Sequence, residues 1–328
     1  IVSKQILSKA YELICTARAM SDIYEENKEI TSKYVHATSK GHEAVQIALG
    51  LQLKSHDWVS PYYRDDALLL SMGITPYELM LQLHAKKDDP FSGGRSYYSH
   101  PSLRRYDMPK IPHQSSATGM QAIPTTGIAM GIQYLHKHKL KKIENVNNSL
   151  VVCSLGDGAI TEGEVSEAIH MASLKQFPIL YFIQDNGWDI SANSSEIRNS
   201  DIGAYFEGFG NIEVVRTSGS DFIQSYLVIH EVLNTIRKER RPFMIHADVP
   251  LLNHHTSGVR MEWYRDDLKD HLKKDPYPIL QKQLLDFGFK KVDLDKLEKK
   301  SKKKVKKDFK NSINASDPEP NELFENVF

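Results

Sequence analysis

Cysteine is scarce in this chain. Of its 328 residues, only Cys15 and Cys153 are cysteines. Two cysteines cannot build the disulfide framework of a small secreted scaffold, so we expect a reducing, intracellular compartment. Cys15 falls on a helical pattern and Cys153 falls in an apolar run, which predicts that both are buried, reduced thiols.

The chain also lacks an excess of charge of either sign. Its 42 Lys and Arg residues balance its 42 Asp and Glu residues. This argues against an overall basic nucleic-acid binder and against an acidic disordered chain. The balance is uneven, because residues 289–310 hold eleven Lys against four acids, and residues 311–328 hold four acids and no base. We interpret the lysine run as a solvated helix face followed by a linker, in preference to a nucleic-acid patch.

Long hydrophobic runs are missing as well. Residues 1–9 contain no uninterrupted apolar core of a secretory signal, and the longest uncharged stretch, Ile111–His136, holds two prolines and many Ser, Thr and Gln residues. Neither pattern is that of a membrane span, so we expect no membrane partner. The chain has no Gly-x-Gly-x-x-Gly motif after a strand, which argues against an NAD-binding dehydrogenase.

The centre of the chain does contain clear strand and helix patterns. Residues 149–155 and 178–184 are short apolar runs, typical of parallel strands that are buried on both faces. A helical pattern lies between them, and Thr161 with Glu164 forms a capping box that predicts where this helix begins. Strand, helix and strand fit into about 36 residues, which is the length of a parallel βαβ unit.

A second unit of the same kind follows. Residues 213–216 and 243–249 have strand patterns, and a helix is expected between them at 221–238. The two units together predict an α/β fold, a doubly wound parallel sheet with flanking helices. Further helices are expected near the N-terminus and at about 41–53 and 76–85.

Glycines and polar side chains follow the two central strands. Gly156-Asp157-Gly158-Ala159 comes directly after the first strand, and Asp185-Asn186-Gly187-Trp188 comes after the second. Carboxyl ends of neighbouring parallel strands meet at one edge of a sheet, and glycines there let backbone amides approach a phosphate. The Asp157 carboxylate suits a divalent cation, with oxygens of Asn186 and the Trp188 backbone as further ligands. Each motif alone would be an ordinary turn, but together they predict a Mg²⁺-diphosphate site.

These motifs also carry a family resemblance. GDGAITEG followed by QDNGWDIS resembles the thiamine diphosphate fingerprint, and the chain resembles the alpha subunit of the decarboxylating component of 2-oxo acid dehydrogenase complexes. The segments GHEAVQIALG (41–50), PYYRDDALLL (61–70), QAIPTTGIAMG (121–131) and NHHTS (253–257) extend the resemblance in the same order. It implies a thiamine diphosphate-binding α/β domain with an N-terminal helical extension over 1–275. Residues 276–328 would then form a helical, Lys-rich C-terminal tail and linker.

The resemblance also assigns site residues. The Mg²⁺ ligands would be Asp157, Asn186 and the carbonyl of Trp188, and His255 would be the catalytic histidine, moving protons with a near-neutral pKa. The remaining residues expected to bind thiamine diphosphate are Tyr63, Arg64, Gly119, Gly156, Gly158 and Ala159.

Three alternatives and departures accompany this assignment. Arg64 could instead form a surface salt bridge with Asp65 or Asp66, and His255 could be an exposed loop residue. Leu251 stands where many relatives have an arginine, and Arg260 is a candidate to supply the missing phosphate contact.

The implied activity is oxidative decarboxylation of a 2-oxo acid, with transfer of the acyl group to a lipoyl group of the complex's acyltransferase. A branched-chain substrate is favoured. The alternatives are a pyruvate- or acetoin-type dehydrogenase alpha subunit, or a non-catalytic phosphate-binding regulator on the same fold. The family's activating glutamate comes from a beta subunit, so we expect an α2β2 assembly or a covalently following beta half. Its location would be cytoplasmic in a bacterium or the mitochondrial matrix in a eukaryote.

Overall fold

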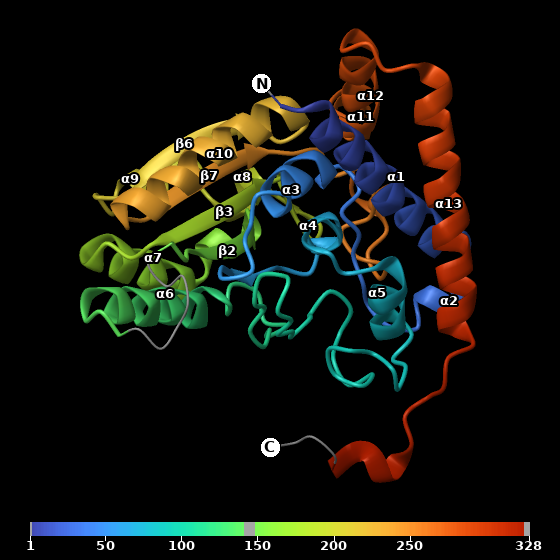
Figure 1. Ribbon diagram of the computed structural model, residues 1–328, viewed down its shortest axis with the longest axis horizontal. Coiled ribbons are helices and arrows are strands. Elements are labelled where there is room, and N and C mark those ends of the chain that lie inside the picture. Colours follow the sequence, from blue (N-terminus) through green and yellow to red (C-terminus); the bar gives the residue numbers. More distant parts are fainter. Residues whose placement is uncertain (1, 141–147, 325–328) are drawn as a thin grey trace.

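The centre of the protein is a five-stranded sheet in the order β1-β2-β3-β7-β6. The structure is a computed structural model that describes residues 2–140 and 148–324 (Figure 1). Every neighbouring pair in this sheet is parallel. The predicted parallel α/β fold is therefore confirmed. The strands are β1 (Trp58–Ser60), β2 (Val151–Gly156), β3 (Ile179–Asp185), β6 (Glu213–Ser218) and β7 (Phe243–Asp248).

Both predicted βαβ units are present. Helix α7 (Gly163–Lys175) connects β2 to β3, and helix α10 (Phe222–Glu239) connects β6 to β7. In each unit the two strands lie side by side in parallel register, with Val151 opposite Ile179 and Glu213 opposite Phe243. The continuous apolar runs of β2 and β3 arise because helices cover both faces of the sheet.

Side chains alternate between two apolar layers. Val152, Leu180 and Phe182 point to the layer that contains α1 (Lys4–Glu26), α3 (Glu43–Gly50) and α10. Cys153 and Tyr181 point to the other layer, which contains α6 (Ala122–Lys137), α7 and α9 (Ile202–Glu207). Figure 1 shows α6 and α7 on one side of the strands and α1 and α3 on the other. The free thiols of Cys15 and Cys153 are both buried, as predicted.

The lysine run forms one long helix that packs against the N-terminal helix. Helix α13 (Lys291–Ile313) buries Leu294, Val305 and Phe309 in the same apolar layer as α1 and exposes most of its lysines (Figure 1). The lysines therefore line a solvated helix face. The domain boundary at residue 275 stays a prediction. Residues 325–328 of the predicted tail lie outside the described residues.

One local prediction was wrong. Helix α7 begins at Gly163, and its N-cap residue Glu162 makes no side-chain capping bond. Thr161 instead ends a short 3-10 turn, where its hydroxyl donates to the carbonyl of Gly158 over 3.0 Å. The Thr161 hydroxyl is therefore hydrogen-bonded within the turn and does not cap α7. A true capping box stands elsewhere, between Thr75 and Glu78 at the start of α5 (Pro76–Leu83).

Several elements complete the fold. Strand β1 is only three residues long, and α6 contains Pro124 and two glycines, so neither has a strong sequence pattern. Among the described residues, no helix is long and apolar enough to cross a membrane. The remaining elements are α2 (Lys28–Thr31), α4 (Asp66–Met72), β4 (Trp188–Asp189), β5 (Ala192–Asn193), α8 (Ser194–Ile197), α11 (Leu268–Lys273), α12 (Pro276–Asp286) and the 3-10 turns Gly158–Thr161, Met261–Trp263 and Pro320–Phe324.

Candidate functional site

A cavity of about 540 Å³ lies at the carboxyl ends of the central strands. Segments that follow β1, β2, β3 and β7 all contribute to its wall, as expected for a ligand site in a parallel sheet. Of the residues predicted from sequence, Arg64 alone is not part of the lining. The others line this one cavity: Tyr63, Gly119, Gly156, Asp157, Gly158, Ala159, Asn186, Trp188 and His255.

Backbone forms part of the cavity wall because two positions exclude a side chain. A Cβ atom on Gly158 would lie 2.5 Å from Cγ of Asp189, closer than atoms can approach. Gly119 has a φ of +78°, and a Cβ there would press on Glu162 and Val165. Bare backbone at Gly158 suits the approach of a phosphate, as the sequence predicted.

The predicted metal ligands meet at this cavity and offer only oxygen atoms. Asp157 is buried, and its Oδ1 accepts a hydrogen bond of 3.3 Å from the backbone N–H of Asn186. Oδ1 of Asn186 accepts from the Trp188 backbone N–H over 3.0 Å. The Trp188 indole donates to Asp267 over 2.8 Å, which holds this segment in place. Hard oxygen donors of this kind suit Mg²⁺.

The fit to a metal ion depends on more than carboxylates. In the part of the chain that the structure describes, no group of three or more His, Cys, Asp or Glu side chains is arranged to hold a metal. A cation at Asp157 would need the Asn186 amide, a backbone carbonyl and oxygens of a bound ligand, which is how Mg²⁺ is held beside phosphates. Burial, with Asp185 nearby, raises the pKa of Asp157.

His255 is buried in the cavity wall and is not an exposed loop residue. Its Nε2 lies 2.9 Å from the Tyr63 hydroxyl, and its Nδ1 has no hydrogen-bond partner within residues 2–140 and 148–324. Burial, followed by the charge of Arg64, holds its pKa well below the usual value. The expected near-neutral pKa is therefore wrong for the ligand-free protein, because desolvation disfavours the imidazolium. His254 supports the loop, as its Nδ1 accepts from the Met261 backbone N–H over 3.0 Å.

Arg64 lies directly behind this histidine. Its side chain is fully buried, its Nη2 donates to the carbonyl of His255 over 2.8 Å, and its guanidinium stacks 5.4 Å from the centre of the Tyr63 ring. Among the described residues it has no ion-pair partner, and its Nε has no acceptor. A buried cation without a carboxylate is costly, so it favours an anion nearby.

The alternative salt bridge for Arg64 is wrong. Asp65 accepts from the Tyr62 backbone N–H over 3.0 Å and from the Gln184 side chain over 2.8 Å. Asp66 accepts from the Ser99 hydroxyl over 2.6 Å. Both carboxylates are buried and hydrogen-bonded to these other groups, and within the described residues neither forms an ion pair with Arg64.

Side chains of the segment 41–50 hold residues of the site in place through buried hydrogen bonds. His42 Nδ1 lies 3.0 Å from Oε1 of Gln184, and its Nε2 lies 3.4 Å from the Asn186 amide nitrogen. Gln46 donates to the same Gln184 oxygen over 2.8 Å and to the Arg64 carbonyl over 3.0 Å. This buried network therefore positions both Asn186 and Arg64. Burial lowers the pKa of His42 to about 3, so its imidazole stays neutral.

The proposed substitute for the missing arginine was wrong. Arg260 pairs with Glu25 at 2.9 Å and with Glu262 at 3.0 Å, and it does not line the cavity. Leu251 is buried, and its carbonyl accepts from Arg265 over 2.7 Å. Arg265 stacks over the Trp188 ring at 5.6 Å, which places this second cation closer to the site than Arg260.

A second, wider cavity of about 910 Å³ adjoins the first. The residues that line both cavities are Tyr63, His100, Ser116, Thr118, Asp189 and His255. Sequence reasoning missed His100 and Asp189. Asp189 directly follows Trp188 in the quoted motif, so its neighbourhood was a usable signal, whereas His100 lies in an irregular loop that gave none. The aliphatic and aromatic part of the second cavity comes from Val35, Ala37, Tyr97, Tyr98 and Ile190.

Comparison with known proteins decides the family. A family model described as dehydrogenase E1 component matches residues 11–321. The chain belongs to the dehydrogenase E1 component family. Within this family it is similar to 2-oxoisovalerate dehydrogenase subunit alpha 2 (mitochondrial) of Arabidopsis thaliana, with 29% identity over 80% of this chain and 53% of that protein.

Other E1 relatives are similarly distant. The mitochondrial 2-oxoisovalerate dehydrogenase subunit alpha of Mus musculus is 29% identical over 93% of this chain and 67% of that protein. The pyruvate dehydrogenase E1 component subunit alpha of Mycoplasma pneumoniae is 27% identical over 88% of this chain and 74% of that protein. The chain spans about half the length of the first curated relatives that it matches. The predicted resemblance to an E1 alpha subunit is confirmed.

Proposed function

We propose that this E1 chain, together with a beta-type partner, decarboxylates a 2-oxo acid with thiamine diphosphate and Mg²⁺ and passes the acyl group to a lipoyl group. The observation that carries the proposal is the single cavity lined by nine residues that were named from sequence alone. Eight of them lie at four separate strand ends and Gly119 lies just before α6, so their meeting supports a shared ligand. Thiamine diphosphate, when bound, would supply the carbanion chemistry that no side chain can provide.

The chain's own residues would hold and orient this cofactor. Backbone at Gly158 and Ala159 would accommodate the diphosphate, and Asp157 with Asn186 would hold Mg²⁺ through oxygen atoms. Arg64 would add positive potential from behind Tyr63, because it is buried and carries no paired carboxylate among the described residues. A direct contact between Arg64 and the diphosphate stays a prediction.

His255 would act on the substrate side of the cavity. It is buried between the first and second cavities, and its hydrogen bond to Tyr63 fixes the orientation of the ring. A neutral imidazole can donate from one nitrogen and accept at the other, so it can move a proton without first losing one. The buried, unpartnered Nδ1 is an available position for such a contact.

A branched-chain 2-oxo acid is the favoured substrate. The second cavity offers Val35, Tyr97 and Ile190 to an apolar side chain. Similarity to 2-oxoisovalerate dehydrogenase alpha subunits supports the same choice. A pyruvate-type enzyme is the second candidate, supported by the similar subunit of Mycoplasma pneumoniae. The relatives include mitochondrial and bacterial proteins, so both predicted locations stay open.

Helix α6 provides the surface that we propose for the beta-type partner. Gly127 and Gly131 lie on its exposed side, and a Cβ on either glycine would touch nothing in the described chain. Glycine inside a helix costs roughly 1 kcal/mol relative to alanine. Nothing within the described chain requires that cost, whereas close approach of a partner helix would.

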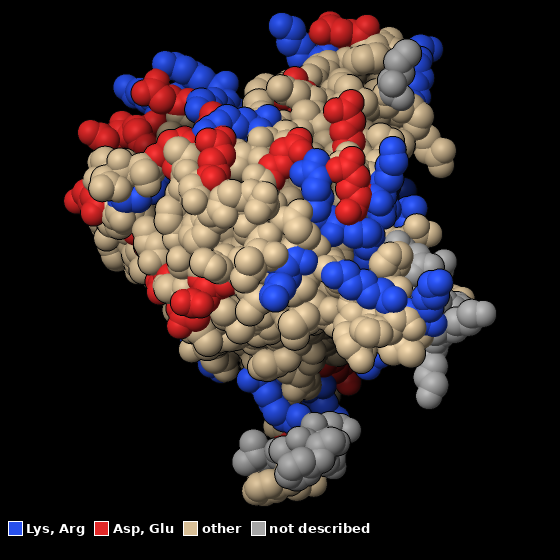
Figure 2. All heavy atoms as spheres, turned by 90° about the vertical axis from the view of Figure 1, so that its left-hand side faces the viewer, with Lys and Arg blue, Asp and Glu red and all other residues tan. Residues whose placement is uncertain are grey.

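The same side of α6 is apolar. Ile123, Met130 and Tyr134 are all exposed on it. Figure 2 shows the side of the molecule that lies on the left in Figure 1, where α6, α7 and α9 are found, and much of it is free of charged side chains. Because Gly119 and Gln121, just before α6, line the cavity, a partner on this helix would lie next to the site.

Calorimetry of cofactor binding tests the proposal. The wild-type chain should bind thiamine diphosphate only in the presence of Mg²⁺. Asp157→Ala should bind it no better with Mg²⁺ than without. Arg216→Gln, a substitution outside the cavity, should bind like wild type. If Asp157→Ala binds as wild type does, the metal assignment is wrong. With a beta partner added, a panel of 2-oxo acids reports the substrate, and unchanged lipoyl acylation in His255→Ala would remove its catalytic role.

A further inference from the structure

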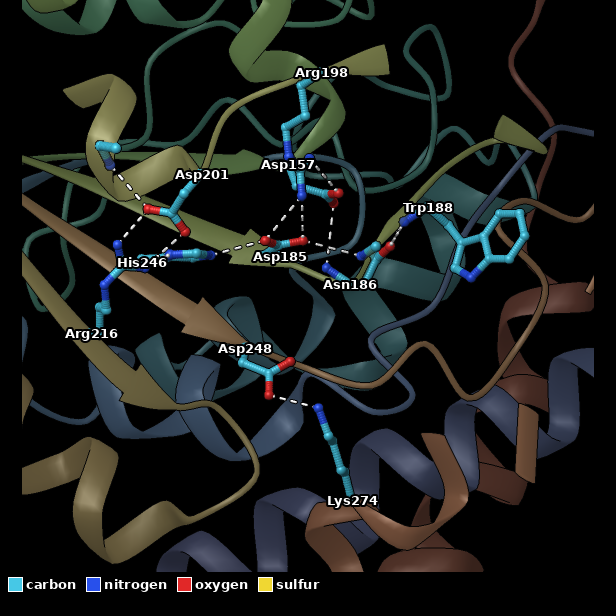
Figure 3. Close-up of polar contacts among 12 residues, drawn as sticks. Asp157, Asp185, Asn186, Trp188, Arg198, Asp201, Arg216, His246, Asp248 and Lys274 are labelled. Atoms are coloured by element: carbon cyan, nitrogen blue, oxygen red, sulfur yellow. Dashed lines mark hydrogen bonds and ion pairs between the residues drawn. The ribbon is translucent and has the colours of Figure 1, made fainter. Parts of the chain in front are cut away.

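Arg198 bridges two carboxylates at the edge of the cavity. It follows α8, and its Nη1 donates to Oδ2 of Asp157 over 3.0 Å. Its Nη2 donates to both oxygens of Asp185, over 3.0 and 3.1 Å (Figure 3). The Arg198 side chain is 14% exposed and that of Asp157 is 1% exposed, so solvent and salt screen this bridge only weakly.

The two carboxylates are not equally tied to other groups. Asp185 also lies 2.9 Å from Nε2 of His246 and accepts from the Gly187 backbone N–H over 3.1 Å. In the described structure, Asp157 accepts otherwise only the 3.3 Å bond from the backbone N–H of Asn186. Arg198 therefore keeps an independent anchor on Asp185, while its contact with Asp157 can be exchanged.

The oxygen atoms that Arg198 occupies belong to the residue expected to bind Mg²⁺. A buried carboxylate that is ionised is costly unless a cation compensates it, and Arg198 supplies that cation to Asp157. A divalent cation at Asp157 would lie a few ångströms from the guanidinium, and like charges at that range repel each other in a partly buried setting. The Arg198 guanidinium and the divalent cation therefore cannot both bind the Asp157 carboxylate without repelling each other.

We infer that Arg198 is the resident counter-ion of Asp157, and that it competes with the divalent cation for this carboxylate while remaining paired with Asp185. The inference rests on the proposed function, since it takes Asp157 as a metal ligand. Arg198 would be a positioning residue, which compensates the site before the metal arrives and lowers the affinity for metal in the absence of cofactor.

The network offers a matched control. Arg216 belongs to the same chain of contacts, because it pairs with Asp201 and lies 2.9 Å from Nδ1 of His246 (Figure 3). It does not touch Asp157, and half of its side chain is exposed. Arg216→Gln consequently removes the same charge from the same network without freeing the metal-binding carboxylate.

The test titrates Mn²⁺ alone into the full chain, without thiamine diphosphate, and measures affinity by calorimetry. We expect Arg198→Gln to bind Mn²⁺ roughly tenfold more tightly than wild type, on the order of the loss of one nearby like charge. Arg216→Gln should stay within about twofold of wild type. An Arg198→Gln affinity that is equal to or weaker than wild type overturns the inference.

Thermal unfolding provides the second readout. Without metal, Arg198→Gln should melt at a lower temperature, because Asp157 and Asp185 are left uncompensated, and Mn²⁺ should raise its melting temperature more than that of wild type. A purely structural role predicts that stability and Mn²⁺ affinity fall together, whereas competition predicts opposite directions. If Arg198→Gln does not fold, Arg198→Lys replaces it: its ammonium cannot bridge both carboxylates, so Mn²⁺ affinity should still rise, by a smaller factor.

Different results would contradict the proposed metal site and the proposed competition by Arg198. If wild type does not bind Mn²⁺, or if Asp157→Asn binds it equally well, the proposed metal site itself is wrong. If wild type binds Mn²⁺ through Asp157 and the Arg198 variants do not bind it more tightly, the site stands and only the competition is wrong.

Discussion

The hydroxyl of Tyr63 lies 2.9 Å from Nε2 of His255, between the two cavities of the site. The two residues come from segments that follow different strands of the sheet and are far apart in sequence. Because the His255 ring is buried and its Nδ1 is unpartnered in the described structure, this hydrogen bond is the contact that fixes the ring.

Removing this hydroxyl should slow turnover more than it weakens the fold. We expect Tyr63→Phe to lower kcat roughly fivefold, since one hydrogen bond that orients a catalytic group is worth about 1 kcal/mol. Cofactor affinity should change little. The measurement is the decarboxylation rate with a beta partner and an artificial electron acceptor. Tyr106→Phe, which removes a hydroxyl from an exposed tyrosine that lines neither cavity, is the control and should match wild type.

A substitution on the exposed side of α6 should have opposite effects on the stability of the chain and on its assembly with the partner. Gly131→Ala should stabilise the isolated chain by about 0.5–1 kcal/mol, because alanine favours a helix and its Cβ meets no atom. The same change should weaken association with the beta partner. Urea unfolding and analytical ultracentrifugation measure the two effects.

Two variants, each with an exposed apolar residue replaced by a charged one, complete that test. Met130→Glu on the proposed interface should prevent association, while Leu227→Glu on α10, which is also exposed, should leave it intact. Equal association by both variants would place the partner on another surface.

A buried ion pair predicts a large stability effect far from the cavity. Asp57 is fully buried and accepts from Nη1 and Nη2 of Arg237 over 2.7 and 2.6 Å. Asp57→Ala should destabilise the protein by about 3–5 kcal/mol, because it leaves a buried guanidinium unpaired. Glu213→Ala, which breaks an exposed pair with Arg241, should cost less than about 1 kcal/mol. Urea unfolding of both variants checks the difference.

Asp66 predicts a pH dependence of stability. Burial raises its pKa from 3.8 to about 7. The folded protein therefore keeps a proton that the unfolded chain releases, so the contribution of Asp66 to stability is complete below pH 3.8 and is lost as pH rises toward 7. Asp66→Asn has no carboxyl group to ionise, so its stability does not fall in this way as pH rises. Across that window, the free energy of unfolding of the variant should rise relative to wild type by up to about 1.4 kcal/mol per pH unit. A constant difference would contradict the protonated state.

The sequence predicted those features that leave a local pattern. The apolar runs of β2 and β3, and the Gly-Asp-Gly turn between β2 and α7, follow from burial on both sheet faces and from close backbone approach. The strand β1 was missed because three residues show no period. Helix α6 was missed because its glycines and Pro124 disguise a helix whose exposed face is also apolar.

Charge environments were harder to predict than positions. The pKa of His255 is lowered by burial and then by the charge of Arg64, which is 191 residues away in sequence but donates to the His255 carbonyl. Arg198 has no motif of its own, and its role becomes visible only when two strand ends bring Asp157 and Asp185 together. Long-range contacts of this kind have no signature in a single sequence.

Asp189 predicts how the site rejects acidic substrates. Its carboxylate lines both cavities and has no hydrogen bond or ion pair among the described residues, and burial raises its pKa. When ionised, it should repel the second carboxylate of 2-oxoglutarate, so wild type should prefer 4-methyl-2-oxopentanoate. Asp189→Asn should raise the relative kcat/KM for 2-oxoglutarate at least tenfold, since removal of one like-charge contact is worth roughly 1.4 kcal/mol or more. Ser116→Ala, at another position of the shared lining, should keep the wild-type ratio. An unchanged ratio in Asp189→Asn would show that the second cavity selects by shape alone.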